Sequence, residues 1–324
     1  MHKLKVTARL IIEELRKRGI NTDVFYADGT TINFLYKSVP HVIIGCNPDI
    51  SAASSFVIAR NKQLTEHLLR KYSSVRLLKT MFYTADESAC EFLQENHLIV
   101  VKPADGAHGN GVTVGIREVD SLSAAIRFSR SYSPSSSVIL QEQVSGRDVR
   151  VLCIDGRPVA ASYRDPATVV GDGYSTIGEL IDRENHENRD RGEVSYDKPL
   201  NRISLEAANI FLGKRISHIP AKGENVVVVG TANIGTGGRS VECLSELPED
   251  MLSDAVSAAG IAGCFICGVD FIYDRQEGTY YLIELNASPS FGLHVYPSAG
   301  KSTDIAKIYV DRLLARYDYL LDGR

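Results

Sequence analysis

The sequence has no run of lysines or arginines, and its 324 residues carry a formal net charge of −4. A protein that binds nucleic acid without sequence preference needs a basic surface, because its affinity comes from neutralising phosphates. We therefore expect no nucleic-acid partner. Hydrophobic residues make up 44% of the chain and charged residues 23%, as in ordinary globular proteins with a sizeable core.

An apolar run long enough to cross a membrane is also missing. The most apolar window, residues 255–269, is shorter than the roughly 20 residues that a spanning helix needs. Residues 1–19 contain no apolar stretch followed by a small-residue cleavage site, so they predict an amphipathic helix and not a signal peptide. We expect a cytoplasmic protein with no membrane partner.

Cysteines are few, and only Cys264 and Cys267 form a CxxC pair. The pair is compatible with a redox centre or with half of a zinc site, but no second CxxC and no pair of histidines lies near it. It sits inside the apolar run GCFICGVDF, which favours two small buried residues. A chain of this length does not need disulfides to fold.

The alternation of helix-like and strand-like patterns predicts an α/β fold without internal repeats. We expect a small N-terminal α/β lobe over residues 1–58, followed by a single helix over residues 51–72 that leads out of it. Within the lobe, the pattern predicts a helix at 7–19 and strands at 24–28, 31–36 and 41–45.

Residues 59–324 are expected to form one larger domain. Its lid subdomain, about residues 75–140, alternates strand and helix patterns, beginning with a strand at 75–78. The core, about residues 141–324, carries a long polar insertion at about 171–222. Long insertions in compact domains are commonly functional or disordered, so we expect residues 171–199 to form a mobile loop with one helix at 177–185.

A turn rich in glycine separates two apolar strands in residues 98–116, LIVVKPADGAHGNGVTVGI. Glycines allow close approach of the backbone to a ligand, successive N–H groups in such a turn bind anions, and Lys102 adds a positive charge. The features suit a phosphate cradle, and an ordinary hairpin turn is the alternative. Neither a Walker A loop nor a Rossmann fingerprint is supported, because the spacing is wrong and no helix pattern follows.

Three side chains with oxygen atoms suggest a metal site. Asp270 lies on one predicted strand, and Glu284 and Asn286 lie on the next, after a short hairpin. Because positions 284 and 286 are two apart, all three can point to one face. Carboxylates on apolar strands are costly unless they are paired or bind metal, and Mg²⁺ prefers oxygen ligands. The alternative is a pair of hairpin carboxylates that face solvent.

Together these features give a chain that, from about residue 55 to the end, resembles the ATP-grasp portion of cyanophycin synthetases and of bifunctional glutathione synthetases. These are carboxylate–amine ligases, and the resemblance implies the ATP-grasp fold: an N-terminal lobe, a mobile lid and a core with an antiparallel sheet. The matching segments occur in the family's order: NKQLTEHLL (61–69), VVKPADGAHGNGV (100–112), QEQVSGRDVRVL (141–152), VVGDGYSTIGELI (169–181), GTANIGTGG (230–238), GVDF (268–271) and IELNASPSFGLHVYPSAGK (283–301).

The resemblance implies an ATP site made by several segments. Lys62 and Lys102 would hold the phosphates, and Asp148 would meet the ribose. The residues expected at the adenine are Glu142, Gln143 and Val144. The residues expected in the flap over the phosphates are Asp105, Gly106, His108, Gly109 and Gly111.

The resemblance also implies cofactors and catalytic groups. Asp270, Glu284 and Asn286 would bind two Mg²⁺ ions, with Mn²⁺ as a possible substitute and Glu284 as the bridge. Arg164, which would meet the acyl phosphate, and Lys102 are the expected catalytic residues. His108 is expected to touch phosphate or to cap its turn. His294 is expected to be structural or to contact substrate, since imidazole suits softer ions than Mg²⁺.

Two departures from the family pattern concern arginines. The related enzymes commonly carry an arginine shortly before the segment 230–238, where this chain has Val228-Val229-Gly230, and the cyanophycin type carries one just before the final histidine, where this chain has Gly292-Leu293. A missing guanidinium weakens charge stabilisation near the reacting carboxylate. The candidates to replace it are Arg164, Arg202 and Arg239.

The implied reaction is amide-bond formation. ATP would phosphorylate a carboxylate, and an amine would displace phosphate, with amino acids or short γ-glutamyl or aspartyl peptides as substrates. Two alternatives are a small-molecule kinase that stops after phosphoryl transfer, and a nucleotide-binding regulatory module that has lost activity. The sequence is also compatible with a homo-oligomer.

Overall fold

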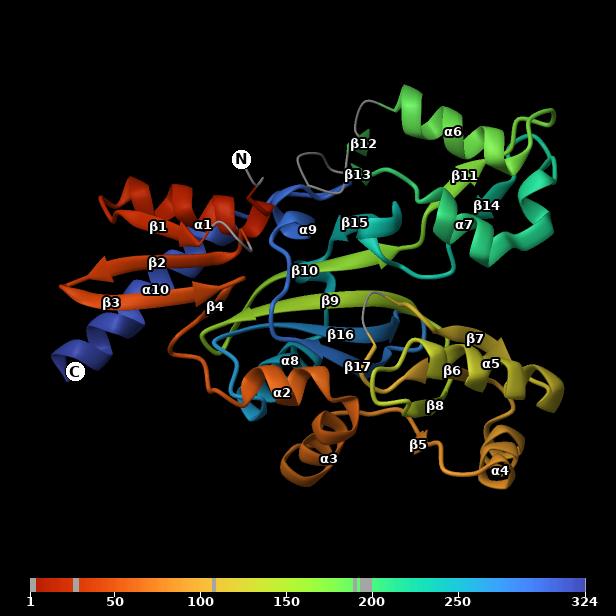
Figure 1. Ribbon diagram of the computed structural model, residues 1–324, viewed down its shortest axis with the longest axis horizontal. Coiled ribbons are helices and arrows are strands. Elements are labelled where there is room, and N and C mark those ends of the chain that lie inside the picture. Colours follow the sequence, from red (N-terminus) through yellow and green to blue (C-terminus); the bar gives the residue numbers. More distant parts are fainter. Residues whose placement is uncertain (1–3, 26–28, 107–108, 189–190, 193–199, 324) are drawn as a thin grey trace.

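The computed structural model describes residues 4–25, 29–106, 109–188, 191–192 and 200–323 (Figure 1). An N-terminal lobe, a central sheet, a lid subdomain and an inserted unit make up the molecule. Across these described ranges, no helix combines the length and the apolar character needed to span a membrane.

The N-terminal lobe is an antiparallel sheet in which neighbouring strands follow one another along the chain. Two helices from distant parts of the chain pack against each other and against this sheet. Ile11 and Leu15 lie four residues apart on the first helix and are fully buried, as expected for an amphipathic helix. The elements are α1 (Val6–Lys17), β1 (Thr22–Phe25), β2 (Thr31–Tyr36), β3 (Val39–Ile44), β4 (Asn47–Pro48) and α10 (Ile305–Asp322).

The central sheet is antiparallel, with strand order β15–β10–β9–β16–β17. Helix α8 packs on one of its faces, together with α2 and α3. The N-terminal lobe covers the opposite face at Leu152 and Ile154, and the part of that face that carries Asp148 and Arg150 remains open. The elements are α2 (Ser55–Arg60), α3 (Lys62–Tyr72), β9 (Arg147–Ile154), β10 (Arg157–Asp165), β15 (Arg239–Glu242), α8 (Glu249–Ile261), β16 (Ile266–Asp274) and β17 (Thr279–Asn286).

The lid subdomain has its own antiparallel sheet, in the order β5–β8–β6–β7, and its own core against two helices. It joins the central sheet where the N–H of Leu282 donates to the carbonyl of Arg76. Figure 1 shows it beside β16 and β17. The elements are β5 (Thr80–Phe82), α4 (Asp86–Asn96), β6 (Ile99–Pro103), β7 (Thr113–Ile116), α5 (Val119–Ser131) and β8 (Val138–Glu142).

The insertion between β10 and β15 is a packed unit with a separate core. Its first helix begins with a capping box, in which Thr176 and Glu179 satisfy each other's backbone N–H groups. The elements are β11 (Thr168–Val170), α6 (Ile177–Glu187), β12 (Arg191–Gly192), β13 (Leu200–Asn201), α7 (Leu205–Leu212), η1 (Gly213–Ser217) and β14 (Asn225–Val227). The remaining short helices are η2 (Ile234–Thr236), η3 (Leu244–Glu246) and α9 (Gly292–Val295).

Two sequence-based expectations for the elements were wrong. The helix over residues 51–72 is two helices, because Asn61 is extended and its side chain caps α3 by accepting from Leu64 N–H. The strand at residues 75–78 is reduced to a bridge at Leu77, and the strand β5 follows it. The helix expected at residues 177–185 is present as α6, and the insertion contains a further helix, α7, beyond the segment for which a helix was expected.

Helix α10 gives a test of the fold. Leu313 is fully buried between the N-terminal lobe and the central sheet, whereas Leu320 on the same helix is 56% exposed. Leu313→Ala should lower the free energy of unfolding by about 2–5 kcal/mol, because it leaves a cavity in the core. Leu320→Ala should change it by less than about 0.5 kcal/mol. Urea denaturation followed by circular dichroism measures both, and equal effects would contradict the packing.

Candidate active site

Two aspartates and two arginines form a cluster on the open part of the central sheet. Asp148 and Arg150 lie two residues apart on β9 and therefore point to the same face. Strand pairing places Arg164 of β10 opposite Asp148, and Asp270 of β16 opposite Arg150. Each acid thus has an arginine as its cross-strand neighbour, which is a favourable arrangement of charges.

Asp270 is the centre of this cluster and is only 2% exposed. Arg150 donates to it twice, from Nε to Oδ1 at 2.7 Å and from Nη2 to Oδ2 at 2.6 Å. Arg164 donates from Nη2 to Oδ2 at 2.9 Å, and Asn286 donates from Nδ2 to Oδ2 at 3.1 Å. Burial opposes ionisation, but the two arginines hold the pKa of Asp270 below its usual range.

Asp148 holds Arg164 in place. Its Oδ1 accepts a hydrogen bond from Arg164 Nε at 2.6 Å. Burial raises the pKa of Asp148 to about 6, although the positive charge of Arg164 acts in the opposite direction. The ribose contact expected for Asp148 stays a prediction.

The hairpin of β16 and β17 has the register that the sequence predicted. Asp270 pairs with Glu284, and Gly268 pairs with Asn286, so the expected metal ligands share one face. Among the described residues, nothing forms a hydrogen bond or ion pair with the half-buried carboxylate of Glu284. Its oxygens are therefore available to a ligand.

Gly268 makes room for Arg150. A Cβ atom at position 268 would lie 3.2 Å from Cδ and Nε of Arg150 and 3.2 Å from Cβ of Pro289, closer than ordinary van der Waals contact. A larger residue here would require Arg150 or Pro289 to shift by a few tenths of an ångström. The glycine therefore favours the close fit of Arg150 against Asp270.

The cluster lies in a cleft of about 530 Å³ between the central sheet, the lid subdomain and the loop 230–234. Its size is typical of sites for small molecules. Its lid side is apolar, with Leu78, Val100, Val112 and Val114. The predicted site residues that line the cleft are Lys102, Gly109, Glu142, Gln143, Val144, Asp148, Arg164, Asp270, Glu284 and Asn286.

The segment expected at the adenine runs along the lid edge of the cleft with its side chains engaged elsewhere. Glu142 accepts from the N–H of Lys79, and Gln143 accepts from the N–H of Gly115, both at 2.7 Å. Within the described ranges, the N–H of Val144 has no partner. The backbone at Val144, beside an apolar wall, is thus free to meet the edge of a flat heterocycle.

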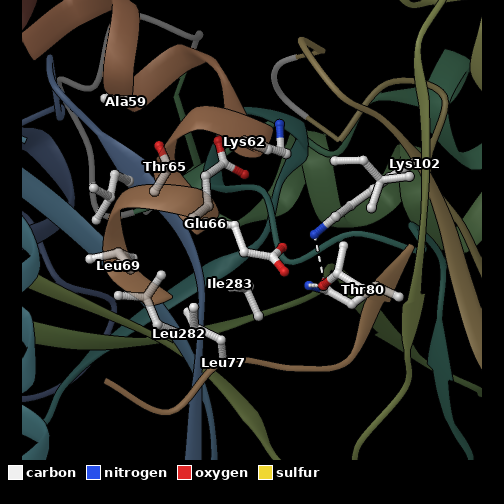
Figure 2. Close-up of a pocket in the computed structure, with 14 residues that line it drawn as sticks. Ala59, Lys62, Thr65, Glu66, Leu69, Leu77, Thr80, Lys102, Leu282 and Ile283 are labelled. Atoms are coloured by element: carbon white, nitrogen blue, oxygen red, sulfur yellow. Dashed lines mark hydrogen bonds between the residues drawn. The ribbon is translucent and has the colours of Figure 1, made fainter. Parts of the chain in front are cut away.

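Lys102 points from β6 into a second, much smaller cavity that adjoins the cleft (Figure 2). Its Nζ donates to Oε1 of Gln141 at 2.7 Å, and Nε2 of Gln141 donates to the hydroxyl of Thr80 at 3.0 Å. Burial and the charge of Lys62 lower the pKa of Lys102 to about 8, while Glu284 and Glu66 act in the opposite direction.

Lys62 lies in the first turn of α3, facing the same small cavity as Lys102 and Glu66 (Figure 2). Its Nζ donates to the carbonyl of Gly106 in the flap at 3.2 Å. The structure therefore brings the two predicted phosphate lysines together, with Lys62 hydrogen-bonded to the flap.

The flap residues divide into two groups. Gly109 lines the cleft, and a Cβ atom there would lie 2.7 Å from Cγ2 of Thr231, so the flap closely approaches the loop 230–234 across the cleft. Asp105 instead binds the lid's own chain, through Ser133 and the N–H of Ser135.

Gly106 and Gly111 fit closely against Pro103, away from the residues that line the cleft. His108 lies outside the residues that the structure describes. The predicted flap is thus brought to the cleft at Gly109, and the neighbouring glycines shape the turn.

The oxygen donors on the hairpin fit a Mg²⁺ ion. In the described part of the chain, no group of three or more His, Cys, Asp or Glu side chains forms a metal cage. Mg²⁺ usually takes only one or two carboxylates from the protein and completes its octahedron with phosphate oxygens and water. Asp270, Glu284 and Asn286 meet that requirement, although the oxygens of Asp270 already accept hydrogen bonds.

The sequence analysis missed Arg150 and Gln141, which both line the cleft. Arg150 had a signal, since it lies two residues after Asp148 on a strand. Gln141 had one as well, as the polar residue that ends the apolar run VIL. Of the three arginines proposed to replace the missing ones, Arg164 lines the cleft, whereas Arg202 and Arg239 are exposed and do not.

His294 is 3% exposed and lies behind the arginines. Its Nδ1 is 3.2 Å from the hydroxyl of Ser162, and its Nε2 has no partner among the described atoms. Burial and the charges of Arg150 and Arg164 lower the pKa of His294 to about 3, so the ring is neutral.

The fold and cleft match known proteins. Residues 67–182 match the family described as prokaryotic glutathione synthetase, ATP-grasp domain. The chain is 36% identical over 244 residues to cyanophycin synthetase of Geminocystis herdmanii, covering 72% of this chain and 28% of that protein. It is 28% identical over 327 residues to the bifunctional glutathione biosynthesis protein GshAB of Clostridium perfringens, covering 96% and 41%.

Among solved structures, the bifunctional glutathione synthetase from Pasteurella multocida superimposes with a TM-score of 0.68 at 24% identity, covering 97% of this chain and 44% of that one. This chain therefore has the ATP-grasp fold, as the resemblance implied. Within that class, it resembles the ATP-grasp portion of cyanophycin synthetases and of bifunctional glutathione synthetases. It spans less than half the length of each of these relatives.

The lowered pKa of Lys102 gives a prediction for nucleotide affinity. In the free protein the ammonium group loses its proton near pH 8, and the attraction for phosphate is lost with it. The affinity for a non-hydrolysable ATP analogue, measured by calorimetry, should fall about tenfold from pH 7 to pH 9, as expected for one group titrating near pH 8. Lys102→Arg should remove this dependence, because arginine stays charged. A flat profile for the wild type would refute the assignment.

Proposed function

We propose that the protein is an ATP-dependent carboxylate–amine ligase that forms an amide bond and releases ADP and phosphate. The observation that carries the proposal is the single cleft that unites an apolar wall, a buried lysine, a hairpin of oxygen donors and an arginine pair. The names of the relatives, cyanophycin synthetase and bifunctional glutathione synthetase, support the same reaction class.

In this proposal ATP lies along the lid side of the cleft. The adenine sits among Leu78, Val100 and Val114 and bonds to the backbone at Val144. Lys62 and Lys102 bind phosphate oxygens, and Lys62 exchanges the carbonyl of Gly106 for one of them. The close approach of Gly109 to Thr231 supports a flap that covers the phosphates.

Glu284 and Asn286, with Asp270, would hold Mg²⁺. The ion would neutralise charge on the phosphoryl group that is transferred. The free carboxylate of Glu284 is the first contact in this arrangement, because neither of its oxygens must leave another partner.

The substrate carboxylate lies near Arg150 and Arg164, where its phosphorylation gives an acyl phosphate. The guanidinium groups stabilise the negative charge of the reacting groups. The closed flap keeps water away from the acyl phosphate, so that the amine, and not water, displaces phosphate. The substrates are amino acids or short peptides, with γ-glutamyl or aspartyl compounds as the first candidates.

The test is the release of ADP and phosphate from Mg-ATP, with a panel of amino acids and γ-glutamyl or aspartyl dipeptides, each with and without an amine. The ligase should require both a carboxylate and an amine. Glu284→Ala should lose at least about 100-fold in rate, because it removes the uncommitted oxygen donor. Glu277→Ala, in the exposed turn of the same hairpin, is the matched control and should keep full activity.

Two outcomes would replace the proposal. Turnover with a carboxylate alone, giving a stable phosphorylated product, would indicate a kinase. Binding of ATP without turnover of any member of the panel would indicate a nucleotide-binding module and would direct attention to the missing arginines near Val229 and Gly292.

A further inference from the structure

The carboxylate of Asp270 is wanted by two kinds of partner: it accepts hydrogen bonds from two arginines, and it is an expected ligand of the metal ion. Both of its oxygens accept hydrogen bonds from guanidinium groups at 2.6–2.9 Å, and Asn286 occupies one of them as well. A Mg²⁺ ion would need an oxygen lone pair at about 2.1 Å. Oδ1 accepts one of these bonds and Oδ2 accepts three, so the lone pairs of Oδ2 are already taken. A dication at either oxygen would also lie close to two guanidinium groups, and these positive charges repel one another.

The charges of the cluster are balanced without a metal ion. Arg150 and Arg164 face Asp148 and Asp270, two positive groups against two negative ones, all largely buried. Glu284 offsets one charge of an arriving dication, so the cluster with its ion carries an excess of positive charge. An additional anion is then needed for compensation, and a carboxylate or acyl phosphate supplies it.

Arg164 can give up its hydrogen bond to Asp270 more easily than Arg150 can. Both donors of Arg150 that reach the cluster, Nε and Nη2, bind Asp270. Arg164 divides its donors, because Nε binds Asp148 and only Nη2 reaches Asp270. Arg164 can therefore release Asp270 and keep an ionic partner. The amide of Asn286 can likewise turn and offer its oxygen in place of its nitrogen.

We propose that a divalent cation and the arginine pair compete for Asp270, so that cation binding at Glu284 and Asp270 releases Arg164 toward the substrate anion. The inference rests on the proposed function and adds a linkage between two ligands of that site. By reciprocity, the anion that captures Arg164 strengthens cation binding by the same factor. The cleft then gains its full anion affinity only after the cation is in place.

The competition is measured by titrating the protein with Mn²⁺ alone and following free Mn²⁺ by electron paramagnetic resonance. Arg164→Met removes the competitor, so Mn²⁺ should bind about fivefold tighter or more, the lower end of typical coupling between sites. Asp270→Asn should weaken binding. Arg147→Met removes an exposed arginine of the neighbouring strand β9, which pairs with Asp165 of β10, and it should leave Mn²⁺ affinity unchanged.

Arg164→Lys separates competition from simple removal of charge. It keeps the charge but loses the planar fork that spans Asp148 and Asp270, so it should also bind Mn²⁺ more tightly. If only Arg164→Met binds more tightly, the effect is electrostatic and the proposal is wrong. If either variant binds Mn²⁺ more weakly, the arginine orients Asp270 for the metal and the proposal is again wrong. If Arg164→Met does not fold, Arg164→Lys tests the proposal alone: tighter Mn²⁺ binding than in the wild type supports it, and weaker binding contradicts it.

This readout is independent of turnover. Absence of Mn²⁺ binding to the wild type would overturn the metal site and the competition with it. Mn²⁺ binding that responds to Arg164 as expected, without ADP release on any substrate, would refute the ligase and leave the competition standing.

Discussion

The pairing of a buried aspartate with two buried arginines is the interaction on which the site depends. A carboxylate as buried as Asp270 is tolerated only with opposite charge and hydrogen bonds to both oxygens. The partners come from β9 and β10, and the carboxylate comes from β16, so the cluster exists only when these three strands lie side by side. Gly268 then leaves space for Arg150, and the hairpin carries Glu284 to the same face. Strand order, glycine placement and hairpin register therefore serve one electrostatic arrangement.

The cleft is made by bodies that do not share a core. The lid subdomain and the insertion each bury their own apolar residues, and they reach the central sheet through few elements. Such units can move against each other without loss of their own packing. What joins them across the cleft is polar or small: Lys62 with the carbonyl of Gly106, and Gly109 beside Thr231. A ligand that offers phosphate oxygens competes with the first of these contacts, so closure and ligand binding use the same side chains.

Much of the fold and the position of the site could be predicted from the sequence, because both rest on local pattern. The hairpin register follows from Asp270, Glu284 and Asn286 on two strands with a short turn between them. The motif order implied the ATP-grasp fold, which the structural comparison confirms. The break at Asn61 was hidden by apolar residues that continue the helical spacing on both sides. Arg150 was missed because its partner Asp270 lies 120 residues away in sequence. The spacing of Asp148 and Arg150 indicates that they share one face of a strand, but it does not indicate which side chain of another strand lies beside them.

Helices α1 and α10 bury each other, although nearly the whole chain separates them. The core of the N-terminal lobe contains Leu313 and Tyr317 beside Ile11 and Leu15, so this lobe lacks part of its interior until α10 has been synthesised. Chains are synthesised at about 5–20 residues per second, and early domains often fold during synthesis. At that rate, tens of seconds pass between the synthesis of the four-stranded sheet and that of α10, and during this time α10 does not cover its part of the apolar face. Contacts of such high sequence separation also slow folding. The N-terminal lobe is thus a part of the nascent chain that needs protection from association with other chains.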